Sequence, residues 1–303
     1  MSRWPNWLPH PALVFVVLAW GLNFVVVKFA LEAWPVQVVM VLRYLLMVPV
    51  MGAYAIAVKQ TYKPVGKEWI RFLFAGFLST GLYMVLFLEG MSRVGAAQGA
   101  VCLATAPIWV SIISVVVGQE IGRWQLFVGG GIAYAGVAGV IWMGTGERYW
   151  TPLGLGLVLA SALVWATSVV LMKPLLKDRP AIGVYLATYA GAAFVLLPYG
   201  GMATLQFDYS TIGFWGWMGL AYLTLIAGAG AFTAYYVGVR EVGSAKASMV
   251  AYFVPVVAAI SAWVLRGDSL NALQIAGVVL VLFGVGLASL KGKKVEPTEP
   301  IGV

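Results

Sequence analysis

The sequence predicts an all-α integral membrane protein, with ten transmembrane helices arranged as two five-helix inverted repeats around a central cavity. Three observations lead to this fold class. The 303 residues are 62% hydrophobic and only 10% charged, which is more apolar surface than a soluble domain of this length can bury. The apolar residues form runs long enough to cross a bilayer. One pattern of residues also occurs twice, 148 positions apart.

Ten apolar runs reach the length of about 20 residues that a helix needs to cross the hydrocarbon core. In chain order they span residues 11–31, 35–58, 69–90, 96–118, 123–143, 153–173, 182–200, 213–237, 244–265 and 271–290. The first run contains Asn23 and Lys28 and has no small-residue cleavage site, so we interpret it as a retained helix rather than a signal peptide. The links are short, which makes neighbouring helices antiparallel.

The repeated pattern divides the chain into two halves. Its aligned residues are Gly95, Ala97, Pro107, Gly129 and Gly136, which correspond to Gly243, Ala245, Pro255, Gly277 and Gly284. A second match, Trp20–Lys28 with Trp165–Lys173, lies 145 positions apart. We expect a first repeat over residues 1–145, a second over 146–290 and a disordered cytoplasmic tail over 291–303. Because five crossings is an odd number, the second repeat must be inverted.

Positive charge predicts the orientation. If the N-terminus is cytoplasmic, 14 of the 19 basic residues fall on cytoplasmic loops and ends: Arg3, Lys59, Lys63, Lys67, Arg71, Arg123, Lys173, Lys177, Arg179, Arg240, Lys246, Lys291, Lys293 and Lys294. Both termini are therefore expected in the cytoplasm. The net charge of +8 then reflects membrane topology, and no nucleic-acid partner is needed to explain it. The single Cys102 excludes an internal disulfide.

Aromatic and polar residues near mid-membrane are the candidates for binding a substrate. They are Trp20, Asn23, Tyr83, Gln98, Trp109, Trp165, Ser168 and Tyr252. Most of the 13 tryptophans fall at predicted helix ends, where the indole prefers the headgroup region, but Trp20, Trp109 and Trp165 do not. Lipid cannot satisfy polar groups, so the polar residues face protein or water. Two interpretations stay open: they line a cavity, or they hydrogen-bond neighbouring helices.

Prolines and glycines recur at equivalent positions of the two halves. Pro107 and Pro255 are expected in mid-helix, where each removes a backbone hydrogen bond, so they are candidate hinges or inherited packing kinks. Two glycine pairs are spaced by seven residues, Gly129 with Gly136 and Gly277 with Gly284. We interpret these pairs as seams for close helix packing.

Charged residues inside the predicted helices are few. Arg43 is the deepest, and it either pairs with a substrate carboxylate or caps helix carbonyls; its repeat counterpart is Thr188. Glu89 is the one acidic residue inside a predicted helix, so any proton coupling would use it, and without coupling transport would be facilitated. The chain has no motif of a metalloprotease, phosphate-binding loop or catalytic triad, so we expect no enzyme, no cofactor and no metal.

The segments AWGLNFVVVK around Trp20, LRYLL at Leu42–Leu46 and the doubled small-residue, proline and glycine pattern resemble the drug/metabolite transporter superfamily, EamA type. Within it, the aromatic content and length are similar to those of the YddG-type exporters of aromatic amino acids. The resemblance implies a bacterial inner-membrane exporter that works by alternating access through a central cavity.

We therefore predict export of amino acids, aromatic ones above all, and of related metabolites. One alternative is a sugar-phosphate or nucleotide-sugar antiporter of the same fold, which would need more basic residues in the cavity than Arg43 alone. Another is a membrane protein that is not a carrier, either a scaffold or a passive channel. The expected partners are the small-molecule substrate and lipid. The oligomeric state stays open between monomer and homodimer.

Overall fold

The computed structural model of the chain describes residues 10–118, 124–142, 150–176, 178–235, 253–267 and 271–289. Within these ranges the regular structure is helical, apart from an isolated bridge between Val94 and Trp150. The elements are α1 (Pro11–Ala33), α2 (Val36–Ala57), α3 (Glu68–Gly76), η1 (Phe77–Leu82), α4 (Tyr83–Met91), α5 (Ala96–Leu103), α6 (Ala106–Val116), α7 (Trp124–Trp142), α8 (Pro152–Leu176), α9 (Ala181–Gln206), η2 (Tyr209–Thr211), α10 (Phe214–Ala221), η3 (Tyr222–Gly230), α13 (Val254–Arg266) and α14 (Ala272–Ser289).

Seven helical spans among the described residues are long and apolar enough to cross a membrane, and each matches a predicted crossing. They cover Pro11–Ala33, Val36–Ala57, Glu68–Met91, Gln98–Val116, Pro152–Leu176, Ile182–Gln206 and Phe214–Tyr235. Three shorter apolar helices, Phe127–Gly136, Val254–Arg266 and Ile275–Gly284, lie where three further crossings are expected. The all-helical membrane fold is thus confirmed. The count of ten crossings stays a prediction, since residues 236–252 lie outside the described ranges.

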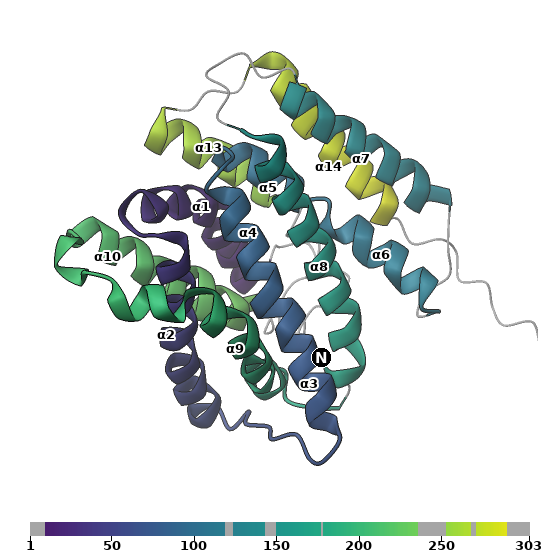
Figure 1. Cartoon of the computed structure of the whole chain (residues 1–303). Coiled ribbons are helices and arrows are strands. Elements are labelled where there is room, and N and C mark those ends of the chain that lie inside the picture. Colours follow the sequence, from purple (N-terminus) through teal and green to yellow (C-terminus); the bar gives the residue numbers. More distant parts are fainter. Residues whose placement is uncertain are drawn as a thin grey trace, which may run out of the picture.

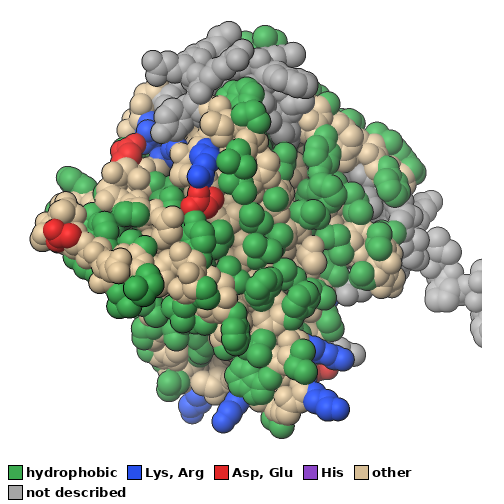
Figure 2. Space-filling view, in the orientation of Figure 1, with side chains coloured by type: hydrophobic (Ala, Val, Ile, Leu, Met, Phe, Trp, Pro, Cys, Tyr) green, Lys and Arg blue, Asp and Glu red, His purple; other side chains and the backbone are tan. Residues whose placement is uncertain are grey.

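The surface has the charge distribution of a membrane protein. In Figure 2, charged side chains gather toward the upper and lower parts of the visible face, and a broad hydrophobic belt lies between them. Large hydrophobic side chains that a soluble protein would bury are exposed on the molecule; Trp215, for example, is 82% exposed and Phe194 68% exposed. Lipid is the solvent that such a surface needs.

Proline shapes two of the helix boundaries. Trp34 is extended, with φ −122° and ψ 138°, because Pro35 disfavours helical geometry in the residue before it, and α1 ends there. The crossing predicted as one helix over residues 96–118 is instead two helices, α5 and α6, separated at Ala104 and Thr105. Pro107 lies in the first turn of α6, where a backbone N–H has no hydrogen-bond acceptor within the helix, so proline is tolerated there. Pro255 occupies the same place in α13. The expectation of mid-helix prolines is therefore wrong for Pro107 and for Pro255, since each lies in the first turn of its helix.

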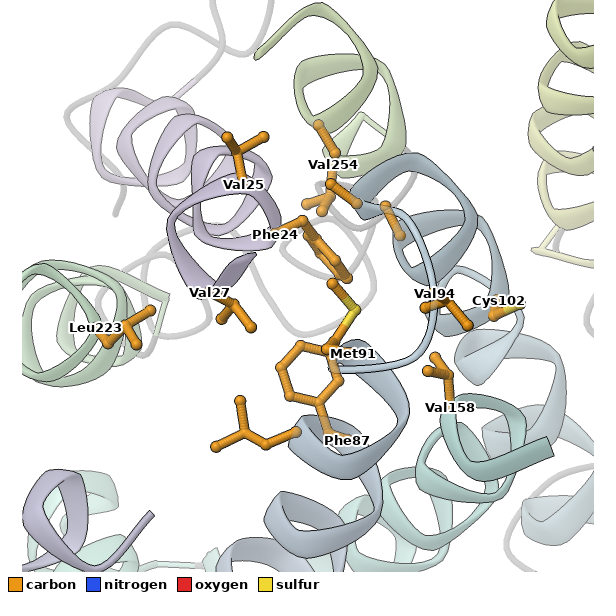
Figure 3. Packing of buried hydrophobic residues seen from close by; sticks show 14 of the residues in the cluster. Phe24, Val25, Val27, Phe87, Met91, Val94, Cys102, Val158, Leu223 and Val254 are labelled. Atoms are coloured by element: carbon orange, nitrogen blue, oxygen red, sulfur yellow. The ribbon is translucent and has the colours of Figure 1, made fainter. Parts of the chain in front are cut away.

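The main core joins helices that are distant in sequence. Phe24 of α1 meets Phe87 of α4 edge to face, with ring centroids 5.7 Å apart and an interplanar angle of 85°. Figure 3 shows these rings beside Met91, with Val254 of α13 and Val158 of α8 nearby. All five side chains are buried. This cluster fixes α1 and α4 at the centre of the bundle.

Glycines allow the closest helix contacts. Figure 1 shows α7 and α14 side by side at one edge of the bundle. A Cβ added at Gly136 would lie 2.6 Å from the carbonyl oxygen of Gly277, and one at Gly284 would lie 2.5 Å from that of Gly129. Since Cβ atoms do not approach that closely, only glycine fits at Gly136 and Gly284. The predicted glycine seams are therefore confirmed, and they pack against each other.

Candidate functional site

A network of aromatic rings occupies the interior of the bundle. Phe232, on the helical turn after η3, lies 5.4 Å from Trp20 of α1, 6.1 Å from Trp165 of α8 and 5.2 Å from Tyr185 of α9, measured between ring centroids. Trp165 also contacts Tyr83 of α4, at 5.1 Å. Phe232 thus joins the two deep tryptophans predicted from the sequence, and Trp165 joins the predicted Tyr83 to them.

The network continues toward α2. Tyr185 meets Tyr189 edge to face at 5.3 Å, and Tyr189 stacks on Tyr44 of α2 at 5.8 Å with an interplanar angle of 16°. We call the rings Trp20, Tyr44, Tyr83, Trp165, Tyr185, Tyr189 and Phe232 the aromatic network. Aromatic pairs at these separations attract each other by about 0.5–1.5 kcal/mol beyond their area burial. Its members come from six different spans, so the network depends on the packing of all six.

Two π-helical segments position parts of this network. Tyr83 directly follows η1, and Trp20 donates its indole N–H to the carbonyl oxygen of Ala227 in η3, at 3.2 Å. π-Helical turns widen the helix and frequently mark functional positions. The two segments begin 145 residues apart, at Phe77 and Tyr222, which is the shift that relates Trp20 to Trp165.

Arg43 of α2 is buried beside the aromatic network. Its side chain is 6% exposed, and one terminal N–H points at the sulfur of Met84, 3.7 Å away. Its Nε has no hydrogen-bond partner among the described residues. The guanidinium lies near enough to the hydroxyls of Tyr83, Tyr185 and Tyr189 to interact with them electrostatically. The structure thus places the deepest predicted charge next to three tyrosines.

The other polar candidates differ in their surroundings. Asn23 is buried, and its Oδ1 has no hydrogen-bond partner among the described residues. The Ser168 hydroxyl donates to the carbonyl oxygen of Trp165 in its own helix, at 2.7 Å. Gln98 lies with its amide beside Gly95, at the start of α5. Asn23 therefore has hydrogen-bonding capacity left for another molecule.

Three further candidates stand outside the aromatic network. Trp109 of α6 makes its ring contact with Tyr134 of α7, at 5.8 Å, and its indole N–H has no partner among the described residues. Pro107 and Pro255 begin helices rather than line the network. Tyr252 lies outside the described residues.

Glu89 of α4 is engaged on both carboxylate oxygens. Arg93, four residues further along and just past the end of α4, donates to Oε2, and the Tyr199 hydroxyl of α9 donates to Oε1. The carboxylate thus links α4 to α9. No group of three or more His, Cys, Asp or Glu side chains suited to hold a metal ion occurs in the ranges that the structure describes.

Comparison with known proteins gives the family. The sequence profile of the EamA-like transporter family matches residues 9–142 and again residues 152–290. The chain belongs to the EamA-like transporter family. It is therefore a membrane transporter, and the resemblance drawn from its sequence motifs is confirmed. The two matched segments fall within the two proposed halves, 1–145 and 146–290.

Several EamA-type relatives align over nearly the whole chain. A probable terminal-alkyne amino-acid exporter of Streptantibioticus cattleyicolor is 26% identical over 95% of this chain and 96% of its own. A probable amino-acid metabolite efflux pump of Salmonella typhimurium is 26% identical over 90% and 91%. The uncharacterized inner membrane transporter YedA of Escherichia coli is 26% identical over 96% and 93%.

A solved structure shares the fold of this EamA-type chain. A crystal structure with 16% sequence identity superposes with a TM-score of 0.64 and covers 91% of this chain and 94% of the other. At that identity the likeness concerns the fold alone. The arrangement of helices described above is thus one that a natural protein adopts.

Sequence reasoning missed Phe232, Tyr185, Tyr189 and Tyr44 as members of the site. Three of them belong to α2 and α9, whose apolar sequences show no polar stripe around these rings. One signal was available: Tyr44 and Tyr189 are 145 residues apart, the shift that relates Trp20 to Trp165. If a two-fold axis relates the two proposed repeats, residues on that axis meet their own counterparts, as Tyr44 and Tyr189 do.

Proposed function

We propose that this EamA-type transporter exports amino acids, aromatic ones in particular, and related small metabolites across a bacterial inner membrane. The aromatic network carries the proposal. Indole and phenol rings suit the flat apolar part of an aromatic amino acid, because offset and edge-to-face contacts are favourable on each ring. The names of the relatives from Streptantibioticus and Salmonella, both amino-acid exporters or efflux pumps, point to the same class of cargo.

The proposed mechanism is alternating access between two inverted repeats. Two contacts related by the 148-residue shift support it: Gly136 packs on Gly277, and Gly284 packs on Gly129. Equivalent pairs that swap partners in this way are related by a two-fold axis. In this proposal the central cavity opens alternately to each side as one repeat rocks against the other.

Two ion pairs lie where such a motion would break contacts. Arg179, between α8 and α9, pairs with Glu68 at the start of α3, and Arg266 of α13 pairs with Glu32 of α1 at 2.7 Å. Each pair joins the two proposed repeats, and the pairs lie at opposite ends of the bundle because α2 runs between Glu32 and Glu68. A carrier that opens to one side at a time needs contacts of this kind at both ends.

A phosphate-bearing cargo is the weaker alternative. A phosphate carries more than one negative charge and calls for several cations. Besides Arg43, the buried cation among the described membrane residues is Lys28. Its ammonium donates to the carbonyl oxygens of Met91 and Val94, both at 2.9 Å, at the end of α4. Lys28 therefore serves the helix end, which leaves Arg43 as the buried cation for a cargo among the described residues.

The proposal is tested by counterflow of labelled tryptophan in proteoliposomes. Trp165→Ala removes the contacts with Tyr83 and Phe232, and we expect it to reduce the flux at least about tenfold while the protein still inserts. Trp215→Ala is the matched control, because Trp215 is 82% exposed on the surface and its loss should leave the flux unchanged. Saturable flux separates a carrier from a channel or scaffold. Normal flux in Trp165→Ala would reject the network as the cargo site.

A further inference from the structure

Arg43 has the properties of a binding group that lacks its partner. A guanidinium has five N–H donors and stays charged in proteins. The one hydrogen bond that Arg43 makes with the described residues goes to a thioether sulfur, at 3.7 Å, and a thioether is a weak acceptor. No carboxylate of the described residues forms an ion pair with it. Keeping such a cation buried at membrane depth is costly, so its retention points to function.

A structural explanation accounts poorly for these facts. A lysine or arginine that caps a helix end donates to backbone carbonyls, as Lys28 does with those of Met91 and Val94. Arg43 lies within α2, between Val36 and Ala57, and donates to no backbone carbonyl of the residues that the structure describes. An arginine near a helix end can also extend its side chain to the headgroups, but Arg43 is buried inside the protein.

The surroundings of Arg43 indicate what would bind it. The hydroxyl of Tyr83 interacts electrostatically with the guanidinium, so an acceptor bound by Arg43 would lie beside it. The ring of Tyr83 contacts Trp165, at 5.1 Å, and thereby joins the aromatic network. A ligand with an anionic oxygen group would bind the guanidinium through that group, and an apolar or aromatic remainder of the ligand would contact the rings.

We infer that Arg43 binds the carboxylate of the cargo, with the Tyr83 hydroxyl beside it, while the cargo's apolar side chain packs on Trp165 and Phe232. This inference rests on the proposed export function and adds to it the chemical group that is recognised. One guanidinium matches the single charge of a carboxylate in a bidentate pair. The site would therefore select amino acids and aromatic carboxylic acids over the corresponding amides and amines.

Binding to the purified wild-type chain is the first test, since it needs no variant. L-Tryptophan and L-tryptophanamide differ in the carboxylate alone, so we expect the acid to bind at least about tenfold more tightly, measured by thermal shift in detergent. The binding of phenylacetate and of phenyl phosphate then compares a carboxylate with a phosphate, each on a phenyl ring. Equal binding of tryptophan and its amide, or tighter binding of phenyl phosphate than of phenylacetate, would overturn the inference.

Variants then assign the effect to Arg43. In Arg43→Gln the preference for the acid over the amide should disappear, and in Arg43→Lys, which keeps the charge without the planar fork, it should be reduced. Arg71→Gln is the matched control, because Arg71 is an exposed arginine of α3, and it should keep the wild-type preference. An undiminished preference in a folded Arg43→Gln protein contradicts the assignment.

Flux measurements separate this inference from the proposed function. If wild-type proteoliposomes transport tryptophan and tryptophanamide equally well, the carboxylate site is wrong and amino-acid export stands. If the chain binds tryptophan through Arg43 but transports neither compound, the site stands and export is wrong.

Discussion

At the scale of single residues, the buried polar groups divide into satisfied and unsatisfied ones. The hydroxyls of Ser161, Ser168 and Thr188 each bond to a carbonyl oxygen of their own helix. Such bonds satisfy a hydroxyl in an apolar interior without any ligand. Asn23 and Arg43 have no comparable partner for Oδ1 and Nε among the described residues. Whether a buried polar group has a hydrogen-bond partner depends on the helices packed around it. Groups without a partner are candidates for binding a ligand, and groups with one serve the packing.

Glu89→Gln tests whether this residue couples protons. Because Arg93 and Tyr199 occupy both oxygens, we expect the substitution to lower the free energy of unfolding by about 1.5 kcal/mol and to leave the dependence of flux on a pH gradient unchanged. Thermal unfolding measures the change in stability. Proteoliposome flux with and without a pH gradient across the membrane measures the coupling. Tyr199→Phe, which removes one donor, is the control for the structural effect. A flux that loses its dependence on the gradient would identify Glu89 as the coupling group.

At the scale of elements, glycine seams decide where helices touch. In the α3–α9 pair, a Cβ at Gly76 would lie 1.7 Å from the carbonyl oxygen of Thr188, and one at Gly191 would lie 1.9 Å from that of Leu73. The backbones of α3 and α9 are therefore in direct contact, as are those of α7 and α14. Without a hydrophobic effect between helices in lipid, such close van der Waals packing provides much of the association energy.

Alanine substitutions in α7 test the seam. Gly136→Ala places a Cβ against the backbone of α14, so we expect it to lower the free energy of unfolding by about 1–3 kcal/mol. Gly131→Ala, on the same helix with nothing within 4 Å of its Cβ, should have no comparable effect. Thermal unfolding in detergent compares the two proteins. Equal stability would show that α7 and α14 do not pack as described.

At the scale of the whole molecule, the proposed orientation is open to direct test. Both termini are expected in the cytoplasm, which places the α2–α3 link inside and the α9–α10 link outside. Lys63 and Ser210 are exposed in these two links. In a Cys102→Ala background, which removes the single native thiol, Ser210→Cys should react with a membrane-impermeant maleimide in intact cells from which the outer membrane has been removed.

Lys63→Cys should react only after the membrane is permeabilised. The unsubstituted Cys102→Ala protein supplies the background labelling. Reaction of Lys63→Cys from outside, with protection of Ser210→Cys, would invert the proposed topology.

The sequence by itself determined the membrane fold, the family and the seven confirmed spans, because hydrophobic length and repeated motifs depend on residues close together in the chain. It also singled out Trp20, Trp165 and Tyr83 as candidates. Only the tertiary structure showed that Phe232 joins Trp20 to Trp165, that Trp109 packs apart on Tyr134, and that a helix break precedes Pro107. The physical reason is that ring contacts and unsatisfied donors depend on which helix faces pack together. A helix that is apolar on all sides has no periodic pattern that indicates which neighbour each face contacts.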